Sequence, residues 1–129
     1  FNGNKVALFG LPGAFTKTCS SLHLPGFVHY SAALKAKGVD RVICISVNDP
    51  WVMDAWGKDQ KTENKVEMIA DGALNFTKAT GLELDLRAKC YGVRCKRFSM
   101  IVDDGLVTTL HFEEGDYSET SAERLLKDL

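Results

Sequence analysis

The amino-acid sequence predicts an α/β fold with a mixed central sheet that is flanked by helices on both faces. Apolar runs of strand length alternate with helical segments along most of the chain, and this alternation is typical of parallel strands joined by right-handed crossovers. Near the C-terminus, Asp104–Gly105 separates two apolar runs, which predicts an antiparallel hairpin. The 129 residues suffice for one domain, and a hydrophobic content of 45% excludes a wholly disordered chain.

Five segments have the length and apolar content of strands. The run Arg41–Val47 (RVICISV) is β-branched and apolar on both faces, which favours a central parallel position in the sheet. Lys5–Gly10 (KVALFG) is a short apolar run ended by a Gly–Leu–Pro–Gly turn, so it also predicts a buried strand. The remaining strands are expected at Val66–Ala70, Arg97–Asp103 and Leu106–Glu113.

Capping residues, prolines and glycines mark the helices. A first helix is expected to begin near Cys19, where Thr16 and Thr18 offer capping hydroxyls, and to be kinked or broken at Pro25–Gly26. Two further helices are expected to end at a glycine: Phe27–Lys37 stops at Gly38, and a helix from the Asp71–Gly72 turn to about Thr80 stops at Gly81. Another runs from Pro50 to about Gly57, with Asn48 or Asp49 as its cap. The last is expected at Ser121–Leu129.

The segment Leu82–Lys96 has no clear period, and it is predicted to be a loop with a helical turn. The resulting order is β-α-β-α-β-α-β-β-α, which is the thioredoxin-like arrangement. Chemistry in that arrangement lies where the first strand meets the first helix, and Cys19 falls at this junction.

The charge balance and the apolar patterning argue against nucleic-acid and membrane partners. The chain has sixteen Lys and Arg and seventeen Asp and Glu, a net charge of −1, whereas nucleic-acid binding usually needs an excess of basic residues. No apolar run approaches the roughly 18–20 residues of a membrane span. Neither a Gly-rich phosphate-binding loop nor a Cys-x-x-Cys pair occurs, so we expect no cofactor and no metal. The expected location is cytoplasmic, with mitochondria or plastids as alternatives because the N-terminus is incomplete.

Cys19 is the candidate for chemistry. A cysteine in the first turn of a helix faces unpaired backbone N–H groups and the positive end of the helix dipole, and both favour the thiolate. Pro12 stiffens the preceding loop, and Thr16 can turn its hydroxyl toward the sulfur or a bound oxygen substrate. A buried helical cysteine with threonine caps is the alternative interpretation of the same spacing.

The pattern Pro12-x-x-x-Thr16-x-x-Cys19 resembles the peroxidatic motif of the peroxiredoxins. The stretches FGLPGAFTKTCSSLHLPGF, LKAKGVDRVICISVNDPWVM and KRFSMIVDDG are similar to the type II, peroxiredoxin-5-like branch, and the similarity runs from Lys5 to Leu129. The resemblance implies a single thioredoxin-like domain over residues 1–129 that lacks N-terminal strands. Lys17 departs from the pattern, because many relatives have a second proline there.

The resemblance also implies an activity, the reduction of hydrogen peroxide and organic hydroperoxides by a thiol. Cys19 would attack the peroxide and become a sulfenic acid, Thr16 would bind the thiolate and the peroxide, and Pro12 would shield the site. The family's arginine falls on Arg97 by the KRFSM stretch, with Arg94 as the nearest rival. The competing functions are a disulfide oxidoreductase, which the missing second thiol in Cys-Ser-Ser-Leu disfavours, and a redox-regulated binding protein.

Turnover requires a reductant for the sulfenic acid. Cys44 matches the resolving position of the plant-like members, but a small thiol inside a strand is equally well explained as core packing. If Cys44 does not resolve, thioredoxin, or glutathione with glutaredoxin, would attack Cys19 directly. Cys90 and Cys95 are interpreted as substitutions without functional effect, with a position of Cys95 near the active site as the alternative. The resemblance further implies a homodimer that packs near the FTKTC loop and the NDPW helix.

Overall fold

The computed structural model describes residues 3–113 and 117–129. A five-stranded sheet runs through the centre of the molecule, with the strand order β3-β2-β1-β6-β7. Its strands are β1 (Lys5–Leu11), β2 (Arg41–Ser46), β3 (Glu67–Ala70), β6 (Arg97–Asp103) and β7 (Leu106–Glu113). All five were predicted from their apolar runs, with ends that differ by only one residue.

The sheet is mixed, as the sequence predicts. β1 pairs in parallel with β2, and β2 pairs in parallel with β3. On its other side β1 pairs antiparallel with β6, which continues through a hairpin into β7. The three inner strands, β2, β1 and β6, are buried almost throughout, because layers cover both of their faces.

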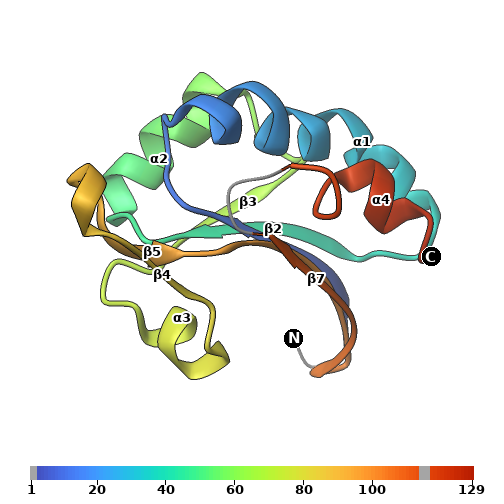
Figure 1. Ribbon diagram of the computed structural model, residues 1–129. Coiled ribbons are helices and arrows are strands. Elements are labelled where there is room, and N and C mark those ends of the chain that lie inside the picture. The colour runs from blue at the N-terminus through green and yellow to red at the C-terminus, as the bar shows by residue number, and fades with distance from the viewer. Residues whose placement is uncertain (1–2, 114–116) are drawn as a thin grey trace.

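Helices cover both faces, but unequally (Figure 1). The helices α1 (Leu24–Ala36), α2 (Pro50–Asp59) and α4 (Ala122–Leu126) lie on one face, whereas α3 (Asn75–Thr80) lies on the other. Asp49 caps α2 by accepting a hydrogen bond from the backbone N–H of Val52 at 2.8 Å, and Gly81, with φ of 71°, ends α3. The fold class expected from the sequence, a thioredoxin-like α/β fold, is confirmed.

Of the kink or break predicted at Pro25–Gly26, the break is wrong. Residues 17–36 form one continuous helix, and Pro25 lies in the first turn of its α-helical part. The turn before it, Cys19–His23, is a π turn in which the backbone N–H of Leu24 donates to the Cys19 carbonyl. A proline ring clashes with the carbonyl four residues earlier in a regular helix, and the wider turn changes that spacing.

The segment Leu82–Lys96 was predicted as a loop with a helical turn, and only the turn is correct. It forms a second, two-stranded sheet from β4 (Glu83–Leu86) and β5 (Gly92–Cys95), with a 3₁₀ turn at Arg87–Lys89 between them. The sequence hides this hairpin because Cys90, with φ of 63°, occupies a left-handed position where a glycine would signal a turn.

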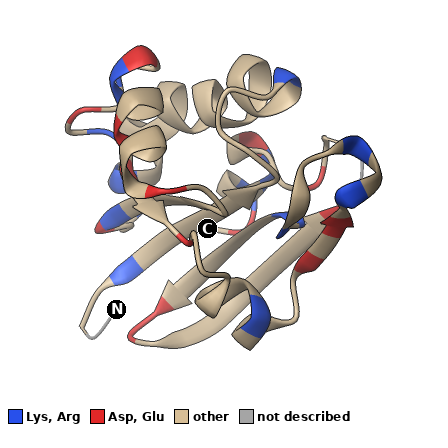
Figure 2. Ribbon diagram, turned by 90° about the vertical axis from the view of Figure 1, so that its left-hand side faces the viewer, with Lys and Arg blue, Asp and Glu red and all other residues tan. Residues whose placement is uncertain are grey.

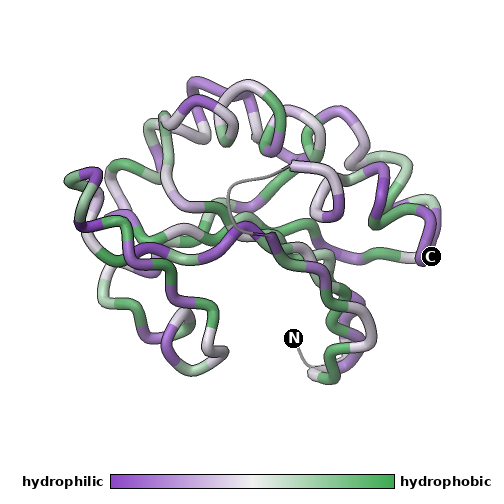
Figure 3. Tube along the Cα trace, in the orientation of Figure 1, coloured by the Kyte–Doolittle hydropathy of each residue, from purple (hydrophilic) through white to green (hydrophobic). Residues whose placement is uncertain are grey.

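The alternation of side chains along β1 creates two cores. Ala7, Phe9 and Leu11 pack with the helices on one face, while Val6 and Leu8 join a cluster on the face toward α3. Figure 3 shows apolar residues concentrated along these strands, and Figure 2 shows Lys and Arg interleaved with Asp and Glu around them. Within residues 3–113 and 117–129, no helix has the length and apolar character needed to cross a membrane.

Candidate active site

The structure brings Cys19 and Arg97 together. Cys19 lies at the start of the π turn that follows the β1 loop, and Arg97 is the first residue of β6, which pairs with β1. The Nη2 group of Arg97 donates to the Cys19 sulfur at 3.2 Å. Both residues are buried, with exposed fractions of 7% for Arg97 and 1% for Cys19. A guanidinium in a poorly hydrated site stabilises negative charge on the sulfur far better than it would in water.

His23 is a buried neighbour of Arg97 that the predicted set of site residues did not include. Its Nδ1 atom lies 2.8 Å from Arg97 Nη1, and its Nε2 atom lies 3.0 Å from the Thr120 carbonyl oxygen. Because a guanidinium only donates, Nδ1 must accept, and the ring proton therefore sits on Nε2 and points at Thr120. The available signal was its position four residues after Cys19, which places both side chains on one side of the helix.

The environment of His23 keeps its ring neutral. Complete burial, and then the charge of Arg97, lower its pKa from 6.5 to about 3. A neutral ring is needed here, since an imidazolium would offer Arg97 a second positive charge instead of a lone pair. The interaction therefore holds Nη1 of the guanidinium on His23 while Nη2 donates to Cys19.

This buried histidine predicts an acid-sensitive stability. Below pH 6.5 an unfolded chain protonates His23, whereas the folded chain does so only near its pKa of about 3. The free energy of unfolding should therefore fall as the pH decreases through this range, with a slope of up to about 1.4 kcal/mol per pH unit. Urea denaturation between pH 7 and 5 measures the slope, which His23→Asn should reduce. His29→Asn, at an exposed site, is the control, and equal slopes in both variants would contradict the assignment.

The segment before α4 holds the far side of this cluster. Glu113 accepts hydrogen bonds from the backbone N–H and the hydroxyl of Thr120, at 3.1 and 2.7 Å. Burial alone would raise the pKa of Glu113, but the hydrogen bonds from Thr120 and its neighbours lower it to about 2. The Tyr117 ring lies 5.9 Å from Arg97 Cζ. The position of Arg97 thus depends on His23, in the first quarter of the chain, and on the segment around Tyr117 and Thr120, near its C-terminus.

Thr16 and Pro12 lie in the loop that leads into the helix. The Thr16 hydroxyl donates to the Gly13 carbonyl at 2.6 Å, so its hydrogen is committed within the loop. The predicted capping hydroxyls are absent: Thr18 makes no side-chain cap, and it is the main-chain carbonyl of Thr16 that accepts from Ser20. With its hydrogen so placed, the Thr16 oxygen is available only as an acceptor.

The four cysteines are all free thiols in this structure. Cys44 is fully buried in β2, and its pKa is raised well above the ordinary value by burial, and then by the neighbouring thiols of Cys95 and Cys19. Cys95 donates to the Leu11 carbonyl at 3.1 Å, and burial raises its pKa to about 12. Cys90 is exposed. Cys44 and Cys95 are thus poor nucleophiles as long as the fold stays closed.

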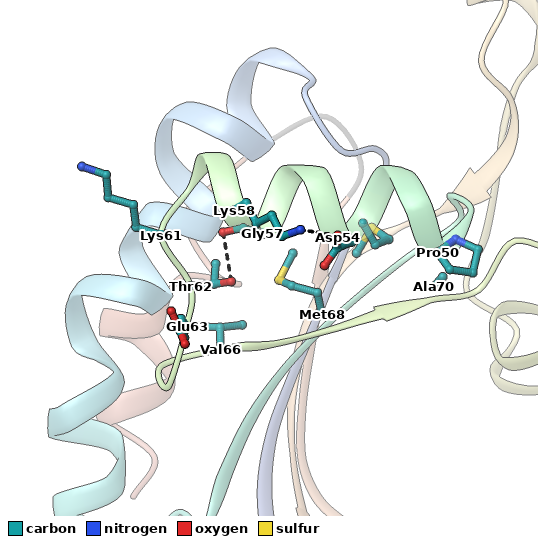
Figure 4. A pocket seen from close by; sticks show the side chains of 11 residues that line it. Pro50, Asp54, Gly57, Lys58, Lys61, Thr62, Glu63, Val66, Met68 and Ala70 are labelled. Carbon is teal, nitrogen blue, oxygen red and sulfur yellow. Dashed lines mark hydrogen bonds and ion pairs between the residues drawn. The ribbon is translucent and has the colours of Figure 1, made fainter.

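A groove of about 670 Å³ lies elsewhere, between α2 and β3 (Figure 4). Met68 and Val66 contribute to its apolar lining, while Lys58 and Asp54, one turn apart on α2, form an ion pair in its wall. None of the residues described above at Cys19 lines this groove. Among residues 3–113 and 117–129, no three His, Cys, Asp or Glu side chains are grouped so that they could hold a metal ion.

Comparison with known proteins points to one family. Residues 1–126 match the Redoxin family. The chain is 51% identical to Peroxiredoxin-2B of Arabidopsis thaliana over 128 residues, which cover 98% of this chain and 79% of that protein. The solved structure of reduced Prx3 in complex with H2O2 from Vibrio vulnificus is 49% identical with a TM-score of 0.96, covering 100% of this chain and 84% of that one. Peroxiredoxin 5 of Alvinella pompejana is 33% identical with a TM-score of 0.88, covering 98% of this chain and 79% of that one.

Proposed function

Because this chain belongs to the type II peroxiredoxins and is a thiol-dependent peroxidase, we propose that Cys19 is its peroxidatic cysteine and that Arg97, Thr16 and Pro12 complete the pocket. The observation that carries the proposal is the 3.2 Å hydrogen bond from Arg97 to the Cys19 sulfur at a buried site. The position of Cys19 in the first turn of the helix adds support, because unpaired N–H groups there also favour the thiolate.

The proposed reaction is a displacement at oxygen. The Cys19 thiolate attacks one oxygen of the peroxide, an S–O bond forms, and the O–O bond breaks. The leaving oxygen takes up a proton and departs as water or an alcohol, while Cys19 becomes a sulfenic acid. The Thr16 oxygen accepts from the peroxide O–H, since its own hydrogen is held by Gly13. Pro12, which has no N–H to offer, shields the site from water.

Ionisation of the sulfur supplies only part of the rate. An ordinary thiol with a pKa of about 8.5 is roughly 3% thiolate at pH 7, so full ionisation gains about 30-fold, or roughly 2 kcal/mol. The larger contribution must act where the O–O bond breaks and charge moves to the leaving oxygen. Arg97 suits that role, because His23 orients its guanidinium before the substrate arrives.

We propose hydrogen peroxide and organic hydroperoxides as the substrates. The similar Prx3 of Vibrio vulnificus has been solved in complex with H2O2. For recycling we propose thioredoxin, or glutathione with glutaredoxin, as the reductant, with Cys44 as an internal alternative. The complete burial of Cys44 favours the external route unless the first helical turn unwinds. Four free thiols suit a reducing compartment such as the cytoplasm, with mitochondria or plastids as alternatives.

We also propose that the protein is a homodimer. Phe15 and Leu22, beside Cys19, and Trp51, on α2, are exposed by 55%, 52% and 81%. Large apolar side chains exposed on neighbouring segments are typical of a surface that another protein chain covers. This support falls on the FTKTC loop and the NDPW helix, where the family resemblance expects the interface.

Mass spectrometry after a single equivalent of hydrogen peroxide tests the proposed function. We expect reduced protein to gain one oxidation at Cys19, trapped by a sulfenic-acid reagent, while Cys90 stays reduced despite its exposure. A Cys19–Cys44 disulfide would identify Cys44 as the resolving thiol, whereas a stable sulfenic acid would assign resolution to an external thiol. Oxidation that falls first on Cys90 would contradict the role of Cys19, because exposure rather than the pocket would then govern reactivity.

A further inference from the structure

Arg94 binds three segments of main chain beside the active site. Its Nε atom donates to the Tyr91 carbonyl at 2.7 Å. Its Nη1 atom donates to the Val47 carbonyl at 3.1 Å and makes a longer, 3.4 Å contact with the Pro12 carbonyl. The guanidinium therefore joins the loop after β1, the loop after β2 and the turn before β5.

All these acceptors are neutral. Within the part of the chain that the structure describes, no carboxylate pairs with Arg94, although its side chain is only partly exposed. Charge-assisted hydrogen bonds to carbonyls are stronger than neutral ones, and a planar fork can bind several at fixed angles. A lysine could supply the charge but not this geometry.

Arg94 also packs against the backbone that orients Thr16. A Cβ atom at Gly13 would lie 3.2 Å from Arg94 Nη1 and 2.9 Å from Thr16 Cγ2. The Gly13 carbonyl, in turn, accepts the hydrogen of the Thr16 hydroxyl. The guanidinium thus binds the Pro12 carbonyl, in the peptide unit immediately before the Gly13 carbonyl that holds the Thr16 hydroxyl.

The same loop holds a strained residue. Phe15 has φ of 61°, a left-handed conformation that a bulky side chain rarely adopts. Such a conformation persists only where the surroundings impose it. Asn48 also anchors the loop, because its side-chain oxygen accepts from the backbone N–H of Ala14 at 3.0 Å.

We propose that Arg94 is a positioning residue for peroxide reduction, acting through the loop of residues 12–16 rather than by contact with the reacting atoms. The inference rests on the proposed function of Cys19 and Thr16 and extends it to a second arginine. The fork holds Pro12 and Gly13 in place, Gly13 orients Thr16, and Thr16 then meets the peroxide in the pocket already prepared by Arg97.

The test compares Arg94→Met and Arg94→Lys with Arg87→Met, whose arginine is exposed and forms an ion pair with Asp85. Single-turnover oxidation by hydrogen peroxide is followed by tryptophan fluorescence, which is suitable because Trp56 donates to Ser20 beside Cys19. We expect the second-order rate constant to fall about 10- to 100-fold in both Arg94 variants, as misplacement of a reacting group allows. The Arg87 variant should keep the wild-type rate.

Two further measurements separate positioning from charge and from folding. The fraction of Cys19 thiolate, titrated by ultraviolet absorbance, should change far less than the rate in Arg94→Lys. Urea denaturation should show each variant folded under the assay conditions. If Arg94→Met fails to fold, Arg94→Lys alone tests the positioning role, because a folded lysine variant with the wild-type rate would overturn the inference. A thiolate fraction that falls in step with the rate would overturn it as well.

Gly13→Ala supplies an independent variant, because the added methyl displaces Arg94 and Thr16 together. We expect a rate loss of similar size without a matching change in the measured fraction of Cys19 thiolate, and an unchanged rate would count against the loop's role. Failure of the proposed function looks different: wild-type protein would then not consume peroxide faster than Cys19→Ser. Failure of this inference alone leaves wild-type activity intact and the Arg94 variants equally fast.

Discussion

Cys19→Ser is expected to slow hydrogen peroxide consumption by about 10³-fold or more, to the rate of an ordinary thiol, because loss of the nucleophile removes the covalent step. The substitution changes one buried atom, so the fold should survive. Stopped-flow measurement of peroxide loss by the reduced protein gives the rate. The effect should be the largest of any single substitution, since Cys19 is the thiol to which Arg97 donates a hydrogen bond.

Two cysteine variants serve as controls for this result. Cys90→Ser, at an exposed site, should leave both the first oxidation and the turnover unchanged. Cys44→Ser should also leave the first oxidation unchanged, and it should slow turnover only if Cys44 resolves the sulfenic acid. A slow rate shared by wild type and Cys19→Ser would leave only the interpretation of a binding protein that kept the fold.

Arg97→Met is expected to lower the second-order rate constant for peroxide by about 10²- to 10³-fold, the usual range for removal of one preorganised donor to a developing charge. The loss should exceed the fall in Cys19 thiolate measured on the same sample. This difference follows from the site, because the guanidinium faces both the sulfur and the place where the leaving oxygen gains charge.

Arg97→Lys and a surface variant complete the experiment. Lysine keeps the charge but cannot bind Cys19 and His23 with one planar fork, so we expect it to recover only part of the rate. Arg41→Met breaks an exposed ion pair with Glu67 and should leave the rate unchanged. Rate and thiolate fraction that fell in equal proportion would refute a transition-state role for Arg97.

The sequence alone carried most of the fold and the centre of the site. Apolar runs predicted the five strands of the main sheet, because the inner strands are buried and the edge strands alternate half-buried with exposed residues along most of their length, and capping at Asp49 located α2. Arg97 was assigned to the site by the resemblance of the KRFSM stretch to the peroxiredoxins, and its place at the start of a strand expected beside the first one was compatible with that assignment. The strands and helices thus follow from local pattern, whereas Arg97 was identified through the family resemblance.

Features that depend on distant partners were not visible. His23 is ordinary as a helical residue, and its importance comes from Arg97 and Thr120, which lie 74 and 97 positions away in the chain. Arg94 was considered only as a rival to Arg97, since nothing local indicates that it binds main-chain carbonyls. The break considered at Pro25 was wrong for the same reason. A proline is incompatible with the interior of a regular α-helix, but the residue itself does not show that the turn before it is a wider π turn.

The π turn also limits how the chain length can vary. Cys19, His23 and Phe27 all face the interior, although eight residues of regular helix would rotate the last of them by about 80° relative to the first. The wider turn absorbs that rotation, so both the nucleophile and the Phe27 ring stacked 3.9 Å from Phe9 can point at the sheet. Between positions 19 and 27 the spacing itself is therefore under constraint: replacement of an outward side chain is tolerable, whereas loss or gain of a single residue would swing either the sulfur or the aromatic anchor out of register.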